Sequence, residues 1–167
     1  MKILMTNNDI NRSIKRISYE IIERNHGVED TVIVGVKQGG VSLAKMIANH
    51  LSSMEDTIVP VTFADITPFR DDVKKEDSKI EDIGTDINDK LVILVDDVLY
   101  TGRTIRAALE YVFHFGRPKK IQLAILVDRG HRQIPIRADF VGKNIPTSTS
   151  ENVNVVIDNE NSFVEIN

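Results

Sequence analysis

The sequence contains no cysteine and no long hydrophobic run. Without cysteine the chain can form neither disulfides nor thiolate-bound metal sites, and this composition suits a reducing cytoplasm. A membrane-spanning helix needs about 18 apolar residues in a row, and no apolar stretch in this sequence approaches that length. Residues 1–25 also lack the apolar region of a signal peptide. We therefore expect a soluble, cytoplasmic protein without a membrane partner.

Positive charge is not in excess either, since 21 Lys and Arg residues stand against 25 Asp and Glu residues, for a net charge of −4. A chain with this balance has no general affinity for nucleic acids, so any RNA site must be a local basic patch. With 167 residues, 41% hydrophobic and 28% charged, the composition predicts one globular domain over residues 1–167. A chain of this length buries about 70% of its unfolded surface.

Apolar periodicity predicts strands that alternate with helices. The first predicted helix is capped by Asn8 and carries four isoleucines on one face: Ile10, Ile14, Ile17 and Ile21. The predicted helices are 8–24, 41–51 and 103–115, and the predicted strands are 31–36, 57–63, 91–95 and 121–127. Pro60 indicates an edge strand or a bulge in the second of these strands. This alternation is typical of an α/β fold with a parallel sheet and right-handed crossovers.

Residues 68–90 depart from this pattern, because 13 of these 23 residues are charged. Such a segment cannot bury much surface, and we expect a solvated loop or a mobile hairpin. It is either a surface excursion without function or a lid that closes over a charged substrate.

The stretch LVILVDDVLYTGRT, residues 91–104, carries the strongest chemical signal. Its apolar run ends in Asp96 and Asp97, at the carboxyl end of a predicted parallel strand, where such sheets bind ligands. The loop Thr101–Thr104 then enters a helix, where free N–H groups, two hydroxyls and the close approach allowed by Gly102 favour a phosphate. Carboxylates accept hydrogen bonds from hydroxyls, so the stretch predicts a pocket for a ribose 5-phosphate, although an acidic pair can also simply cap a turn. The sequence has neither G-x-G-x-x-G nor G-K-[ST], which excludes a dinucleotide fingerprint and a P-loop.

This stretch resembles the phosphoribosyl diphosphate (PRPP) signature of type I phosphoribosyltransferases, in which two acids follow four apolar residues and precede T-G-x-T. Together with DITPFRDDV and VDRGHRQIPIRADFVGKNIPTS, it resembles the PyrR family of pyrimidine operon attenuation regulators and uracil phosphoribosyltransferases over nearly the whole chain. The resemblance implies a type I phosphoribosyltransferase fold: a central, mostly parallel sheet flanked by helices, a mobile charged lid at about 68–90, and a small hood from the chain termini. It further implies conversion of uracil and PRPP to UMP and diphosphate, UMP-responsive binding to the pyrimidine operon mRNA leader, and a homodimer.

The resemblance also implies roles for individual residues. Asp97, the catalytic residue, and Asp96 beside it would hold the ribose hydroxyls and stabilise the positive charge that develops on the ribose. PRPP would lie along Asp96, Asp97, Val98, Leu99, Tyr100, Thr101, Gly102, Arg103 and Thr104. Its pyrophosphate would meet Lys37, Gln38, Gly39, Gly40, Arg70 and Arg129. The base would meet Phe140 and Val141, although Phe140 would equally suit a core position.

Mg²⁺ is the one cofactor that the resemblance implies, bound together with PRPP and mostly through water. The sequence shows no histidine or carboxylate cluster of the kind that forms a metal cage, so we predict no permanent metal and no organic cofactor. RNA would bind the polar face of the first helix, which is otherwise a solvated helix face. Its residues are Arg12, Lys15, Arg16 and Tyr19, with Arg132, Arg137 and Lys143 as a possible extension.

Two departures from the family leave three interpretations open. PyrR proteins usually carry Thr-Arg-Gly at Gln38-Gly39-Gly40, and Thr and His at Lys15 and Tyr19. The Lys-x-Gly-Gly loop also resembles that of purine phosphoribosyltransferases. The chain is thus a uracil phosphoribosyltransferase that regulates through RNA, the same enzyme without RNA function, or a purine phosphoribosyltransferase.

Overall fold

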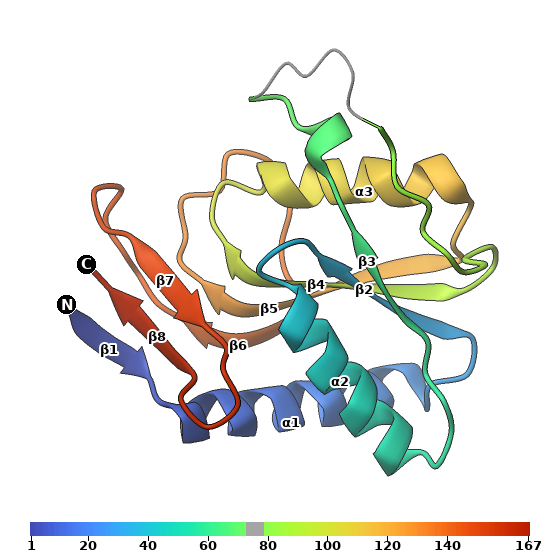
Figure 1. The fold of residues 1–167 in the computed structure, drawn as a ribbon, viewed down its shortest axis with the longest axis horizontal. Helices are drawn as coiled ribbons and strands as arrows, with labels where there is room; N and C mark the ends of the chain where they lie inside the picture. The colour runs from blue at the N-terminus through green and yellow to red at the C-terminus, as the bar shows by residue number, and fades with distance from the viewer. Residues whose placement is uncertain (73–78) are drawn as a thin grey trace.

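The computed structural model describes residues 1–72 and 79–167, and its centre is a five-stranded parallel sheet in the order β3-β2-β4-β5-β6. The strands are β2 (Thr31–Val36), β3 (Val61–Ala64), β4 (Leu91–Leu99), β5 (Lys120–Asp128) and β6 (Phe140–Asn144). Helices α1 (Asn7–Asn25) and α2 (Val41–Met54) cover one face, and α3 (Arg103–Phe115) covers the other (Figure 1). After β2 the chain adds β3 on one side, and it then returns to add β4 on the other. The carboxyl ends of β2 and β4 therefore form the switch point where such sheets bind ligands.

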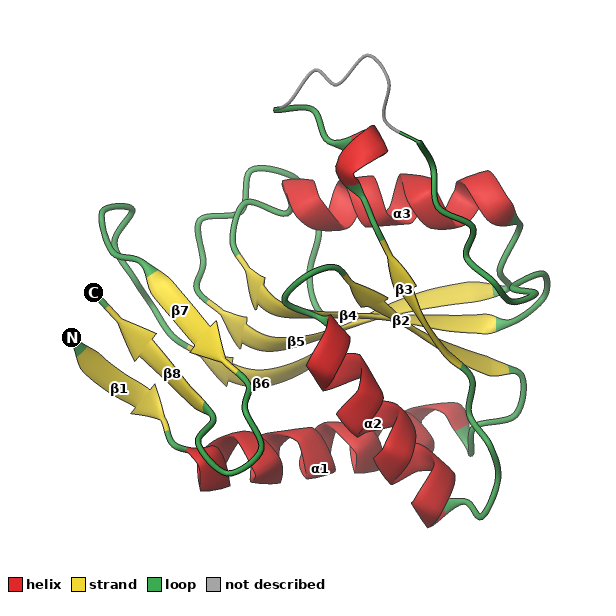
Figure 2. Cartoon of the chain, viewed as in Figure 1, coloured by secondary structure: helices red, strands yellow, loops and turns green. Residues whose placement is uncertain are grey.

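The two ends of the chain form a second, smaller sheet. It contains β1 (Lys2–Met5), β8 (Phe163–Ile166) and β7 (Val153–Val156), in that order and antiparallel. Figure 2 shows this sheet standing beside the carboxyl-terminal edge of the central one. The parallel sheet, its helices and this terminal sheet confirm the fold predicted from the resemblance, with the terminal sheet in the place of the hood.

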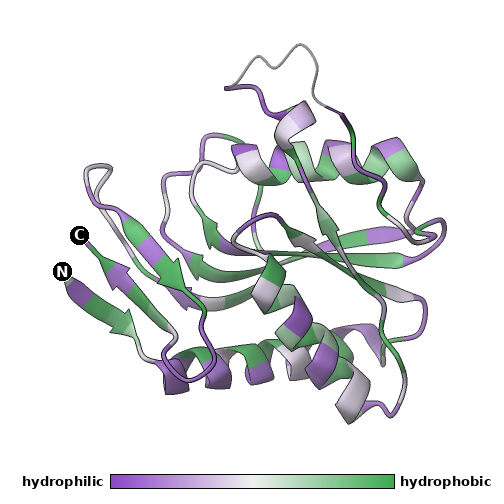
Figure 3. Ribbon diagram, in the orientation of Figure 1, coloured by the Kyte–Doolittle hydropathy of each residue, from purple (hydrophilic) through white to green (hydrophobic). Residues whose placement is uncertain are grey.

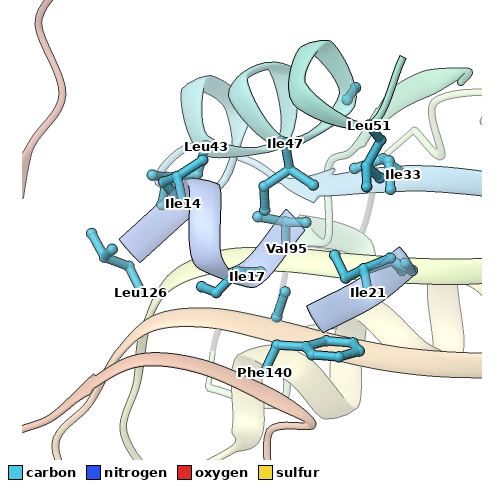
Figure 4. Packing of buried hydrophobic residues seen from close by; sticks show 14 of the residues in the cluster. Ile14, Ile17, Ile21, Ile33, Leu43, Ile47, Leu51, Val95, Leu126 and Phe140 are labelled. Carbon is cyan, nitrogen blue, oxygen red and sulfur yellow. The ribbon is translucent and has the colours of Figure 1, made fainter. Parts of the chain in front are cut away.

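Apolar side chains fill both faces of the central sheet. The isoleucines predicted to share one face of α1 are each 0–1% exposed, and they pack with α2 on β2 and β4 (Figure 4). Leu94, Ile105 and Tyr111 belong to a second cluster, under α3. Since β4 is covered on both faces, its first residues are apolar without alternation. Figure 3 shows the result, with hydrophobic colour gathered on the central strands and the inner sides of the helices.

Several predicted boundaries differ from the structure. Helix α2 runs to Met54 rather than to residue 51, and β5 spans Lys120–Asp128 rather than 121–127. Three further differences have a clear local cause. Helix α1 is capped by Thr6 rather than Asn8, because the Thr6 hydroxyl accepts from the Asp9 N–H (3.3 Å) and the Asp9 carboxylate accepts from the Thr6 N–H (2.8 Å). Strand β4 runs on to Leu99, since the acidic pair still lies within its ladder to β5. Strand β3 begins only after Pro60, a residue that has no N–H to donate.

The described parts of the segment 68–90 are less solvated than predicted. The short 3₁₀ helix η1 (Thr67–Phe69) lies against α3, and Ile83 and Ile87 are 3% and 1% exposed in the cluster under α3. Two apolar anchors are thus enough to hold the arm that leads into β4. The part of the predicted lid at residues 73–78 lies outside the described residues. Within the described part of the chain, no helix has the length and apolar character to cross a membrane.

Candidate active site

The loop after β2 touches the acidic pair at the end of β4. A Cβ atom added to Gly39 would lie 2.3 Å from Asp97 Oδ2, and one added to Gly40 would lie 2.1 Å from the Val95 carbonyl oxygen. Only glycine allows the backbone to approach this closely. The structure thus brings together the predicted pyrophosphate loop, Lys37–Gly40, and the predicted ribose site, although 56 residues or more separate them in the sequence.

The two carboxylates of the acidic pair have different surroundings. Asp96 is 7% exposed, and its Oδ1 accepts a hydrogen bond from the Asp97 N–H (2.9 Å). Asp97 is half-buried, and its Oδ1 accepts from the Val98 N–H (2.7 Å). Burial, and next the neighbouring Asp97 charge, raise the pKa of Asp96 well above its ordinary 3.8. Asp97 is therefore the carboxylate that a ligand in the crevice reaches first.

The raised pKa of Asp96 predicts a pH-dependent stability. A carboxyl group whose pKa is raised by folding favours the folded state below its unfolded pKa, and this contribution is lost as the pH rises through the folded value. Asp96→Asn cannot ionise and keeps the oxygen that accepts from Asp97. We expect the variant to melt at a higher temperature than the native protein at pH 8, with the gap closing as the pH falls towards 4. Thermal unfolding of both proteins between pH 4 and pH 8 checks this prediction. The same difference in melting temperature at every pH would contradict it.

The predicted PRPP loop enters α3 in a suitable geometry for a phosphate. Gly102 adopts φ 92° as the cap of α3, the Thr101 hydroxyl accepts from the Arg103 N–H (3.3 Å), and the Thr101 carbonyl accepts from the Gln133 N–H (2.8 Å). Arg103 and Thr104 are exposed, whereas Leu99 is 3% exposed. The first N–H groups of a helix are free to bind an anion. Leu99 can contribute to the site only by its backbone, and Val98 and Tyr100 are half-buried.

Three cations predicted to lie near the phosphates of PRPP have carboxylate partners from residues 71–81. Lys37 pairs with Glu81 (2.8 Å), Arg103 with Asp71 (2.7 Å), and Arg70 with Asp72 (2.6 Å). The bond to Glu81 raises the pKa of Lys37. The sequence analysis did not find these pairs, although the matching charges of the two loops and of residues 68–90 were a signal for them.

Arg129 does not lie in the crevice as a free cation. It is 6% exposed, stacks on the Tyr100 ring at 4.1 Å, and donates to the Thr147 hydroxyl (3.1 Å) and to the carbonyls of Ser148 (3.0 Å) and Glu151 (2.7 Å). These are the contacts of a buried arginine that joins the PRPP loop to residues 147–151. The expectation that Arg129 binds pyrophosphate does not fit this structure, because the guanidinium is already engaged.

Arg129→Met should therefore lower stability more than ligand affinity. We expect a loss of about 2 kcal/mol in the free energy of unfolding, because a charged donor to three oxygen atoms is removed. Urea unfolding measures this, with Arg117→Met, an exposed arginine after α3, as the matched control. Unchanged stability together with a tenfold weaker affinity for pyrophosphate would restore the ligand role.

Phe140 also needs a correction, because its side chain lies in the core. It is 2% exposed, packs among the isoleucines of α1 (Figure 4), and has the Arg24 guanidinium 5.6 Å from its ring centre. A ring so enclosed cannot stack on a base in the crevice. Val141, the next residue, instead lines a cavity of about 450 Å³ together with Leu99, Asp128 and Asn144, at the carboxyl ends of β4, β5 and β6.

Most of the residues predicted to bind RNA, though not Lys15 and Tyr19, line two hollows that border β6. Arg12, Arg16 and Lys143 line one of about 420 Å³, and Arg132 and Arg137 line the cavity that also holds Val141. Arg16 donates to Glu20 (2.7 Å) and to the carbonyls of Val141 (3.1 Å) and Gly142 (2.7 Å), so it supports the structure of this face. Lys15 and Tyr19 are exposed on α1.

Across residues 1–72 and 79–167, no group of three or more His, Cys, Asp or Glu side chains is arranged to hold a metal ion. Asp96 and Asp97 are two adjacent carboxylates between the predicted phosphate loops. Two carboxylates suit Mg²⁺ that is bound through water and substrate oxygens, which is the ordinary way proteins hold this ion.

Comparison with known proteins agrees with the fold. Residues 2–160 match the family model described as a phosphoribosyl transferase domain. Hypoxanthine phosphoribosyltransferases of Staphylococcus aureus and Trypanosoma cruzi share the fold, with TM-scores of 0.72 and 0.73 at 23% and 21% identity. The alignments cover 88% and 98% of this chain and 79% and 95% of theirs. The chain belongs to the phosphoribosyltransferases.

Much higher identity connects it to one branch of that family. The Bifunctional protein PyrR of Limosilactobacillus fermentum is 52% identical over 98% of this chain and 94% of its own. That of Enterococcus faecalis is 58% identical over 85% of this chain and 82% of its own. Within the phosphoribosyltransferases, the chain belongs to the PyrR family.

Proposed function

We propose that this chain is a cytoplasmic uracil phosphoribosyltransferase that also regulates a pyrimidine operon, by UMP-responsive binding to its mRNA leader and attenuation of transcription. Membership of the PyrR family supports both activities. Within the structure, the contact between Gly39 and the Asp97 carboxylate carries the proposal, because it joins an anion-binding loop to a hydroxyl-binding acid.

In the proposed reaction the chain acts mainly by position and charge. The N–H groups at Thr101–Thr104 bind the 5-phosphate, Asp96 and Asp97 accept from the ribose hydroxyls, and the loop Lys37–Gly40 binds the diphosphate. As the C1–diphosphate bond breaks, positive charge grows on the ribose beside the Asp97 carboxylate, which stabilises it. Uracil N1 then forms the new bond to C1, and its proton passes to solvent. Mg²⁺ bound with PRPP would neutralise charge on the departing diphosphate.

For the base we propose the side of the crevice next to Val141, where Asp128 and Asn144 offer polar groups beside an apolar wall. A purine remains the competing substrate class, because the Gln38-Gly39-Gly40 loop resembles that of purine enzymes. Rates of PRPP consumption with uracil, hypoxanthine and guanine separate the two. A clear preference for uracil supports the proposal, and a preference for either purine overturns it.

For RNA we propose the exposed side of α1 and the adjoining hollow lined by Arg12, Arg16 and Lys143, presented by a homodimer. Contacts of Lys and Arg with phosphates weaken as salt rises, whereas specificity for an RNA comes from bases in loops. Tyr19 is 54% exposed and offers a ring for stacking. Because the chain has a net charge of −4, RNA must be attracted by a local basic surface such as this one.

The RNA proposal is tested with a pyrimidine operon leader RNA, with and without UMP, over a salt series. UMP-enhanced binding with a steep salt slope supports it. Arg12→Ala should then reduce that slope by about one unit if the side chain contacts one phosphate. Lys119→Ala, an exposed lysine far from α1 in the sequence, is the control. Weak RNA binding that does not respond to UMP would indicate an enzyme without RNA regulation. Lys15 and Tyr19 would then be the residues to change to the Thr and His that are usual in the family. Sedimentation of the same samples tests the homodimer.

A further inference from the structure

The charged segment before β4 places carboxylates on the cations of both phosphate loops. Glu81 Oε2 lies 2.8 Å from Lys37 Nζ in the pyrophosphate loop, and Asp71 Oδ2 lies 2.7 Å from Arg103 NH1 in the PRPP loop. Arg70, a third predicted pyrophosphate ligand, makes a two-point pair with Asp72 (2.8 and 2.6 Å). A carboxylate presents to a cation the same kind of acceptor oxygens as a phosphate. Each pair therefore occupies a group that the phosphates of PRPP would need.

Other contacts hold this segment in place without its carboxylates. The Glu81 carbonyl accepts from the Tyr111 hydroxyl of α3 (2.9 Å), and the Ile83 carbonyl accepts from the Thr62 hydroxyl of β3 (2.6 Å). On the other side, the Phe69 carbonyl accepts from the Arg106 guanidinium, and the Phe69 ring meets Tyr111 edge to face. Figure 1 shows both arms of the segment against α3. The arms would consequently keep their places if the side-chain charges were removed.

The strength of these pairs allows exchange. The side chains of Lys37 and Glu81 are 34% and 51% exposed, and those of Arg103 and Asp71 are 50% and 42% exposed. Exposed ion pairs are weak and salt-sensitive, whereas the 5-phosphate and the diphosphate of PRPP each carry more charge than one carboxylate. PRPP can therefore displace the carboxylates, but its affinity is reduced by the interactions that it must break.

We propose that Asp71 and Glu81 act as internal competitors of PRPP: Asp71 for the 5-phosphate at Arg103, and Glu81 for the diphosphate at Lys37. This inference rests on the proposed function, because it takes Lys37 and Arg103 as phosphate ligands. The two residues lower the affinity for PRPP and thereby raise the PRPP concentration that is needed to occupy the site.

The two competitors can be tested separately, because each faces a different part of the ligand. Glu81→Gln should tighten the binding of inorganic pyrophosphate by about two- to five-fold and leave that of ribose 5-phosphate unchanged. Asp71→Asn should do the reverse. The double variant should bind PRPP about four- to twenty-five-fold more tightly, as the product of the two effects. Isothermal titration at low salt measures all three ligands.

A control must separate local competition from the loss of two negative charges. The double variant Glu55→Gln/Asp56→Asn removes two exposed carboxylates after α2, near the opposite end of the sheet. It should bind PRPP within two-fold of the native protein. Far-ultraviolet circular dichroism and thermal melting check that all variants are folded.

The outcomes distinguish this inference from the proposed function. Unchanged or weaker binding of both anions by the Asp71 and Glu81 variants would overturn the competition, and weaker binding would show that these carboxylates position Lys37 and Arg103. Tighter pyrophosphate binding by Glu81→Gln, with no PRPP binding by any variant, would support the competition and refute the proposed function. A gain in PRPP affinity no larger than that of the Glu55→Gln/Asp56→Asn control would also overturn the inference.

Discussion

Asp97→Asn is expected to lower kcat/KM for ribosyl transfer by about 100- to 1000-fold, the usual loss when one charge-stabilising group is removed from an active site. Asparagine keeps the oxygen that accepts from the Val98 N–H, so the backbone at the end of β4 should not move. What is lost is the negative charge beside the loop Lys37–Gly40, where the diphosphate departs and the ribose becomes positive. Steady-state kinetics with uracil and PRPP measure the effect.

The control for this experiment is Asp56→Asn, which removes an exposed carboxylate after α2 and should change kcat/KM by less than two-fold. A kcat/KM within threefold of the native value for Asp97→Asn would show that another group stabilises the ribosyl cation. A loss confined to KM would give Asp97 a binding role only, because a group acting in the transition state lowers kcat as well.

Gly40→Ala is expected to cost about 3 kcal/mol of the free energy of unfolding, as severe overpacking does. Its added methyl group would lie 2.1 Å from the Val95 carbonyl oxygen and 2.8 Å from the backbone of Val36. These are ladder atoms of β2 and β4, so they cannot move aside without breaking the centre of the sheet. Urea unfolding followed by circular dichroism measures the loss.

Gly39→Ala is the matched comparison, because the three atoms nearest to the added methyl group would all belong to the Asp97 carboxylate, at 2.3–2.6 Å. A short side chain can turn away where a strand cannot, so this variant should unfold within about 1 kcal/mol of the native protein and still lose most of its activity. Equal losses of stability for both glycines would contradict the close packing described here. Full activity of Gly39→Ala would show that Asp97 has no fixed place beside the loop.

Helices α1 to α3 and strands β2 to β5 could be predicted because their signals are local, whereas β1, β6, β7 and β8 were not predicted. The isoleucines of α1 repeat at helical spacing, and the apolar runs of β4 and β5 predicted strands covered on both faces. The boundaries were less accurate where a neighbour decides them. The Thr6–Asp9 capping box moved the start of α1, and pairing with β5 carried β4 past the acidic pair to Leu99.

The candidate site also has one part that could be predicted from the sequence and another part that could not. Asp96 to Thr104 are contiguous, so their residue types already described an anion-binding loop beside two acceptors. The roles expected for Arg129 and Phe140 were harder to judge from sequence, because each is a suitable residue type near the right motif and yet is buried in the structure. The Arg129 guanidinium donates to the carbonyls of Ser148 and Glu151, which lie 19 or more positions later in the chain. Its orientation therefore depends on the fold of that later loop.

The amino-acid sequence by itself determined the α/β class, the loop into α3 that is predicted to bind phosphate, and the family, since these depend on periodicity and on residues adjacent in the chain. Only the tertiary structure decided that Gly39 meets Asp97, that Phe140 is core, and that Asp71 and Glu81 occupy Arg103 and Lys37. The reason is physical: contacts between charges and close approaches of backbone depend on distance in space. The order of the strands brings the ends of β2 and β4 together, and no local pattern in the sequence records that order.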